Sequence, residues 1–155
     1  MNKTLERTKS MTPKILVGYD GSEGAKAALL RTVVLAKMMG AEVQALWVRD
    51  SLPHYPETVD EVAAEKESSD AFFNKIKQQA QSLLKEQAVP VRFISRAGNP
   101  AHVIIEHAKE TDVDLIAVGA AGHSGLWRHL LGHTADRVSK NAPCSVLIVR
   151  EPKPV

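Results

Sequence analysis

Short apolar segments alternate with amphipathic helical segments along almost the whole 155-residue chain. Segments that are apolar at nearly every position indicate strands covered on both faces, which is typical of parallel sheets. Alternation of such strands with helices predicts one doubly wound, Rossmann-like α/β domain with helices on both faces of the sheet. The five strands are expected at residues 15–17, 43–48, 91–95, 115–118 and 145–149.

Capping residues mark the expected ends of the helices. Ser22 is a good N-cap, and Gly40 ends the apolar periodicity that follows it. Asn99 is a second N-cap, with Pro100 at the first helical position. A long helical pattern runs over residues 58–87, and a short one runs over residues 134–140.

Composition limits the classes of function. A net charge of +2 is too small to indicate a nucleic-acid partner, and no apolar run is long enough for membrane insertion. The single Cys144 excludes an internal disulfide, and His102 and His107, five residues apart, do not share one helix face as metal ligands would. We expect a cytoplasmic protein with a flexible extension at residues 1–12, a domain at 13–150 and a tail at 151–155.

The loop after the fourth expected strand has the chemistry of an anion site. Gly119, Gly122 and Gly132 allow close backbone approach, and a helix begins directly after Gly132. The N–H groups at a helix N-terminus attract phosphate. No carboxylate lies between Gly119 and Ala135, whereas this stretch holds one arginine and three histidines. These glycines are either adjacent to a ligand or only turn residues, and the helix start favours the ligand.

Three expected strands end at residues that we expect to meet at one edge of the sheet. Asp20, Val48 and Gly119 lie at these ends. Doubly wound folds bind ligands beyond the carboxyl ends of the strands, where the strand order reverses. Asp20 is either a ligand residue or the turn residue that caps the helix near Ser22, and both roles are compatible.

Four segments along the chain form a more specific pattern. They are KILVGYDGS at residues 14–22, RAGNPA at 96–101, the spacing Gly119-x2-Gly122-x9-Gly132, and APCSVLIV at 142–149. In this order, over residues 13–150, they resemble the nucleotide-binding subset of the universal stress protein family. The resemblance implies strand order 3-2-1-4-5, a homodimer through Ser145–Val149, and binding of ATP, or of AMP or ADP, with Mg²⁺ as a possible companion ion.

The same resemblance assigns roles to individual residues. It implies that Asp20 approaches the adenosine, that Val48 contacts adenine through its backbone, and that Gly119 and Gly122 line the ribose and phosphates. Gly132, His133 and Thr134 are expected to bind phosphate through N–H groups and a side chain. His133 departs from the family pattern, which has Ser or Thr at this position. Three alternatives stay open: phosphate binding is kept with a stronger pH dependence, Thr134 supplies the hydroxyl, or the site binds phosphate more weakly.

The function implied is a stress-response module in which bound nucleotide regulates contacts with an unknown protein partner. The second interpretation is a dimeric interaction protein of the same family that binds no nucleotide. The chain lacks the lysine of a P-loop, so at most slow ATP hydrolysis is expected. The turn at residues 18–23 also does not match the Ser-Gly-Gly loop of adenylating pyrophosphatases.

Overall fold

The computed structural model describes residues 12–50, 58–121 and 131–152, and within them it confirms the predicted α/β fold. A five-stranded parallel sheet has the order β3-β2-β1-β4-β5, so the strand order reverses between β1 and β4. The strands are β1 (Lys14–Gly18), β2 (Glu42–Asp50), β3 (Val91–Gly98), β4 (Leu115–Gly119) and β5 (Ser145–Val149). The helices are α1 (Glu23–Met39), α2 (Val59–Leu83), α3 (Pro100–Thr111) and α4 (His133–Asn141).

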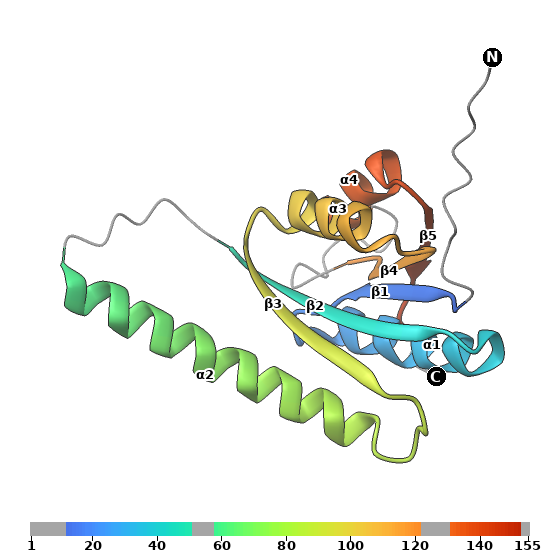
Figure 1. Cartoon of the computed structure of the whole chain (residues 1–155), viewed down its shortest axis with the longest axis horizontal. Coiled ribbons are helices and arrows are strands. Elements are labelled where there is room, and N and C mark those ends of the chain that lie inside the picture. The colour runs from blue at the N-terminus through green and yellow to red at the C-terminus, as the bar shows by residue number, and fades with distance from the viewer. Residues whose placement is uncertain (1–11, 51–57, 122–130, 153–155) are drawn as a thin grey trace.

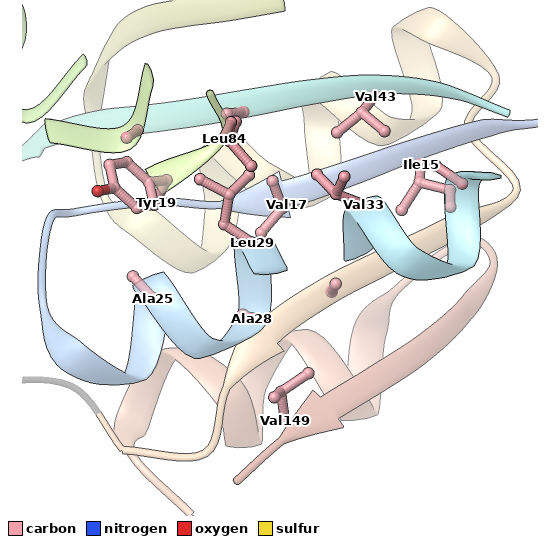
Figure 2. Close-up of a cluster of buried hydrophobic side chains, with 14 of the residues drawn as sticks. Ile15, Val17, Tyr19, Ala25, Ala28, Leu29, Val33, Val43, Leu84 and Val149 are labelled. Atoms are coloured by element: carbon pink, nitrogen blue, oxygen red, sulfur yellow. The ribbon is translucent and has the colours of Figure 1, made fainter. Parts of the chain in front are cut away.

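Two helices cover each face of the sheet (Figure 1). On one face, α1 and α2 pack against β1 and β2 through a cluster that includes Ile15, Val17 and Leu29 (Figure 2). On the opposite face, α3 and α4 pack over Leu16 and Ile116. The alternation of Ile15, Leu16 and Val17 between the two clusters explains why β1 is apolar at every central position.

The predicted N-caps are confirmed. The Ser22 hydroxyl accepts a hydrogen bond of 3.2 Å from the Ala25 amide, and the Asn99 side chain accepts one of 3.2 Å from the His102 amide. Gly40 follows α1 with a φ of 62°, a left-handed conformation that glycine adopts without a steric cost. These local hydrogen bonds fix where α1 and α3 begin, and therefore how their first turns meet the strand ends.

The predicted boundary of the long helix was wrong by four residues. The pattern extended to Gln87, but α2 ends at Leu83, and a turn follows in which the Gln87 amide donates to the Leu84 carbonyl at 2.8 Å. The chain must reverse there to enter β3, which starts four residues later, at Val91. Among the helices that the structure describes, α2 included, none combines the length and the apolarity that a membrane span needs.

Trp47 joins α2 to the sheet. It is 9% exposed, and its ring lies 5.3 Å from the Phe72 ring and 5.7 Å from the Phe73 ring, centroid to centroid. Aromatic pairs at such distances contribute beyond simple burial. Trp47 therefore packs between α2 and the sheet.

Candidate functional site

A pocket of about 400 Å³ opens at the carboxyl ends of β1, β2 and β4, beside the first turns of α1, α3 and α4. It lies where the strand order reverses, between β1 and β4. Here the loops that follow two neighbouring strands leave on opposite faces, and the space between them stays open. The topology alone thus explains why a pocket forms at this edge of the sheet.

The pocket brings together six of the seven residues that were singled out from the sequence. They come from four segments far apart in the chain: Asp20, Val48, Gly119, and the group Gly132, His133 and Thr134. The seventh, Gly122, lies outside the described residues. The position of these six residues around one pocket is an observation, and their binding roles stay predictions.

Asp20 is held in place by the turn that precedes α1. Its Oδ1 accepts a hydrogen bond of 2.9 Å from the Ser22 amide, and the intervening Gly21 has a φ of 81°. The interpretation of Asp20 as a turn residue is therefore confirmed, while Ser22, not Asp20, caps the helix. The same turn holds the residue at the pocket lining, so the two alternatives for Asp20 are compatible.

The structure gives a reason for a glycine at position 119 that the sequence did not reveal. A Cβ atom on Gly119 would lie 2.8 Å from the backbone carbon and oxygen of Gly24, in the first turn of α1. A Cβ atom on Gly24 would in turn collide with the Ala121 carbonyl oxygen. Both glycines therefore allow α1 to approach the end of β4, backbone against backbone. Glycine inside a helix costs stability. The presence of Gly24 in a helical segment therefore already indicated close packing at this position.

The N-terminus of α4 faces the pocket without a side-chain cap. Gly132 is the N-cap residue, and no side chain of the described residues caps this helix start. The residues that follow, His133 and Thr134, line the pocket. The Gly132 amide donates to the Ala120 carbonyl at 2.7 Å. The fold therefore engages that N–H group, and the phosphate-binding role of Gly132 stays a prediction. The first-turn amides of His133 and Thr134 remain suited to an anion.

Part of the pocket lining forms an apolar wall, and apart from Val48 the sequence did not identify it. Leu46, Pro100, Ile104 and Val118 line it together with Val48. In the sequence these residues resemble ordinary core positions. The usable signal was Pro100, because a helix that begins directly after a strand places its first turn at the carboxyl edge of the sheet.

The titratable groups around the pocket differ in character. Burial raises the pKa of the Tyr19 phenol above its ordinary value of 10.0, and the charges of Asp20 and Glu23 raise it further, so Tyr19 stays neutral. Asp20 is the one carboxylate and His133 the one imidazole among the described lining residues.

Within residues 12–50, 58–121 and 131–152, no three metal-ligating side chains come together. A single carboxylate beside an anion site still fits Mg²⁺, which is commonly held by one or two carboxylates and substrate phosphates.

Comparison with known proteins places this arrangement in context. Residues 11–150 match the universal stress protein family. A universal stress protein of Methanocaldococcus jannaschii is 34% identical over 160 residues, covering 99% of this chain and 91% of that protein. A universal stress protein of Bacillus subtilis is 36% identical over 148 residues, covering 90% of this chain and all of that protein. The structure of UspA from Lactobacillus plantarum superposes with a TM-score of 0.79 at 30% identity, covering 91% of this chain and 99% of that one.

More distant structures share the fold and were solved with nucleotides. A universal stress protein in complex with cAMP has a TM-score of 0.69 at 24% identity, covering 90% of this chain and 98% of that one. A family protein from Arabidopsis thaliana with AMP bound has a TM-score of 0.66 at 20% identity, covering 91% of this chain and 93% of that one. At these identities the likeness establishes the shared fold.

Proposed function

We propose that this chain, which belongs to the universal stress protein family, is a regulatory module that binds an adenine nucleotide in the pocket between β1 and β4. One observation carries the proposal. Residues from four separated segments meet around a single pocket that offers an apolar wall, one carboxylate and an uncapped helix N-terminus. An adenine nucleotide needs these three chemistries, for its base, its ribose hydroxyls and its phosphate.

The apolar wall suits the adenine ring. Leu46, Val48 and Ile104 present aliphatic side chains, and the flat base buries its faces against such surfaces at a favourable transfer free energy. Asp20 lies on the same pocket lining and is oriented by its turn, so its carboxylate is suited to accept hydrogen bonds from the ribose hydroxyls. Bound AMP, cAMP and dAMP in proteins of this fold support an adenine nucleotide over other ligands.

The phosphate belongs at the start of α4. The amides of His133 and Thr134 lie in its first turn, and the Thr134 hydroxyl and His133 imidazole add two further groups able to donate hydrogen bonds. The helix dipole adds a partial positive charge there. If the ligand is ATP with Mg²⁺, Asp20 and the phosphates would hold the ion, which would neutralise part of the phosphate charge.

Nucleotide content and affinity test the proposal directly. Protein purified without added nucleotide is denatured, and the supernatant is separated by anion exchange against adenine nucleotide standards. We expect an adenine nucleotide in that supernatant. Calorimetric titration of nucleotide-stripped protein with AMP, and with ATP and Mg²⁺, then gives the affinities. We expect binding of adenine nucleotides and at least about tenfold weaker binding of GMP, since the base sits on an apolar wall of fixed shape.

Absence of both co-purified nucleotide and heat of binding contradicts the proposal. That result would favour the second interpretation, in which the chain is a dimeric interaction protein that binds no nucleotide. Thermal unfolding with 1,000-fold excess of ligand over the dissociation constant provides an independent check, because binding at that excess stabilises the folded state by about 4 kcal/mol.

We further propose that two copies associate through β5. This strand lies at the edge of the sheet and pairs only with β4 among the described strands, while Val146, Leu147 and Ile148 are half-buried. An apolar edge strand is an aggregation hazard unless it is covered, and a second copy related by a two-fold axis covers it. Light scattering during size exclusion is expected to give twice the chain mass of 16.9 kDa. A monomeric mass at micromolar concentration contradicts this interface.

A further inference from the structure

His107 of α3 and Gln44 of β2 form a polar pair buried between α3 and the sheet. Their side chains are nearly inaccessible, with 4% of His107 and 8% of Gln44 exposed. The His107 Nε2 lies 2.8 Å from the Gln44 Oε1. Because a carbonyl oxygen accepts hydrogen bonds, Nε2 carries the proton, and Nδ1 is the bare nitrogen of a neutral ring. Nδ1 is buried and has no hydrogen-bond partner.

A second proton on this ring would be costly. It would place a charge, and a donor without an acceptor, in a buried space. Burial lowers the pKa of His107 below its ordinary 6.5, and the Arg96 guanidinium lowers it further. Glu110 on α3 acts in the opposite direction, while Arg92 adds to the lowering. Glu110 is also 2.8 Å from Arg96, so its carboxylate is already engaged in an ion pair.

The other described elements around α3 offer no compensation for the charge of a protonated His107. On β1, the neighbour of Gln44 in the sheet is Leu16, which is fully buried and apolar. On α4, Asp136 pairs with Lys140 at 2.9 Å, and Arg137 is exposed. Among the groups that the structure describes around His107, Glu110 is therefore the one that favours the protonated ring.

The pair lies next to the pocket wall. Leu46 follows Gln44 by two residues and so lies on the same face of β2, and Ile104 precedes His107 by one turn of α3. Both Leu46 and Ile104 line the pocket. The position of α3 against β2 therefore determines the shape of the apolar wall.

We propose that the His107–Gln44 pair is a pH-sensitive latch that holds α3 against the sheet when His107 is neutral and loosens it when His107 is protonated. Below pH 6.5 the unfolded or locally opened chain takes up the proton while the closed structure does not. Stability is therefore complete above pH 6.5 and decreases as the pH falls toward the lower pKa of the folded state. Loss of nucleotide affinity on acidification would follow, and only this consequence rests on the proposed function.

Urea unfolding of ligand-free protein tests the latch. His107→Gln removes the titration and keeps a polar side chain, while His102→Gln changes an exposed histidine of the same helix. Between pH 6.5 and 5.0 we expect the folded-to-unfolded ratio of the wild type to fall by up to about tenfold per pH unit more than that of His107→Gln. His102→Gln should follow the wild type. An identical pH dependence for the wild type and His107→Gln overturns the proposal.

Two measurements on the wild type remain decisive even if His107→Gln does not fold. Ring-nitrogen NMR should show His107 mostly neutral, with its proton on Nε2, at pH 6.5, the ordinary pKa of a histidine side chain. Hydrogen exchange, corrected for intrinsic rates, should show the α3 amides losing protection between pH 7.5 and 5.5 while the β1 amides keep theirs. A titration midpoint of His107 at or above its ordinary pKa of 6.5, or unchanged α3 protection, refutes the latch. Failure of nucleotide binding alone refutes only the proposed function.

Discussion

Gly119→Ala is expected to destabilise the protein by about 3 kcal/mol, the upper part of the range for overpacking in a rigid environment. The added Cβ would lie 2.8 Å from the backbone carbon and oxygen of Gly24. No side-chain rotation relieves this contact, because the Cβ position is fixed by the backbone of residue 119 and its neighbours are backbone atoms of Gly24. Helix α1 must therefore move away from β4. Urea unfolding at pH 7.5, where His107 is neutral, measures the loss of unfolding free energy.

Gly18→Ala is the matched control. Its Cβ would lie 3.2 Å from the Ile104 Cδ1, the flexible end of a side chain, so we expect a loss below about 1 kcal/mol. Gly24→Ala should resemble Gly119→Ala, because its Cβ would collide with the Ala121 carbonyl oxygen, where α1 approaches the end of β4. The double variant should lose less than the sum of the two single losses, as coupled neighbours do. Equal losses for Gly119→Ala and Gly18→Ala would show that the Gly24–Gly119 contact is not rigid.

Val48→Phe is expected to weaken AMP binding at least about 30-fold, which corresponds to about 2 kcal/mol. Val48 is half-buried, and its side chain lies on the pocket lining beside Leu46, so the larger ring takes up space that the proposed adenine requires. Calorimetric titration of nucleotide-stripped protein measures the affinity. Thermal unfolding without ligand checks that the variant is folded.

Val59→Phe serves as the control for Val48→Phe. Val59 is the first residue of α2, is 84% exposed and lies outside the pocket lining. The same substitution there should leave the affinity for AMP within about twofold of the wild type, because surface changes away from a site have small effects. An unchanged affinity in Val48→Phe, in a protein that binds AMP, would place the nucleotide elsewhere on the molecule.

The features that were predicted correctly are those with a local cause. The Ser22 and Asn99 caps bind amides three residues ahead, and the left-handed Gly40 ends its own helix. Hydrophobic patterning likewise depends on near neighbours, so the strands and helices appeared in the right order. The end of α2 was missed because the turn before β3 depends on the distance that the chain must cover to return to the sheet.

Candidate site residues were found where the chemistry is distinctive. Asp20 and the residues from Gly132 to Thr134 stand at strand or helix ends, and the topology of a parallel sheet brings such ends to one edge. Pro100 and Ile104 were missed as pocket residues because an apolar side chain facing a cavity and one facing the core have the same sequence pattern. The engagement of the Gly132 amide by Ala120 was also hidden, since it depends on how the loop closes.

The sequence by itself determined the fold class, the helix starts and the group of residues at the strand ends, because each depends on periodicity, capping or chain direction. Only the tertiary structure decided which groups touch across the sheet. Gly24 and Gly119 meet backbone to backbone, and Gln44 and His107 share a hydrogen bond across 63 positions of sequence. Contacts of this kind depend on the crossover connections and on the packing distance between layers, and neither is encoded in any short segment of the chain.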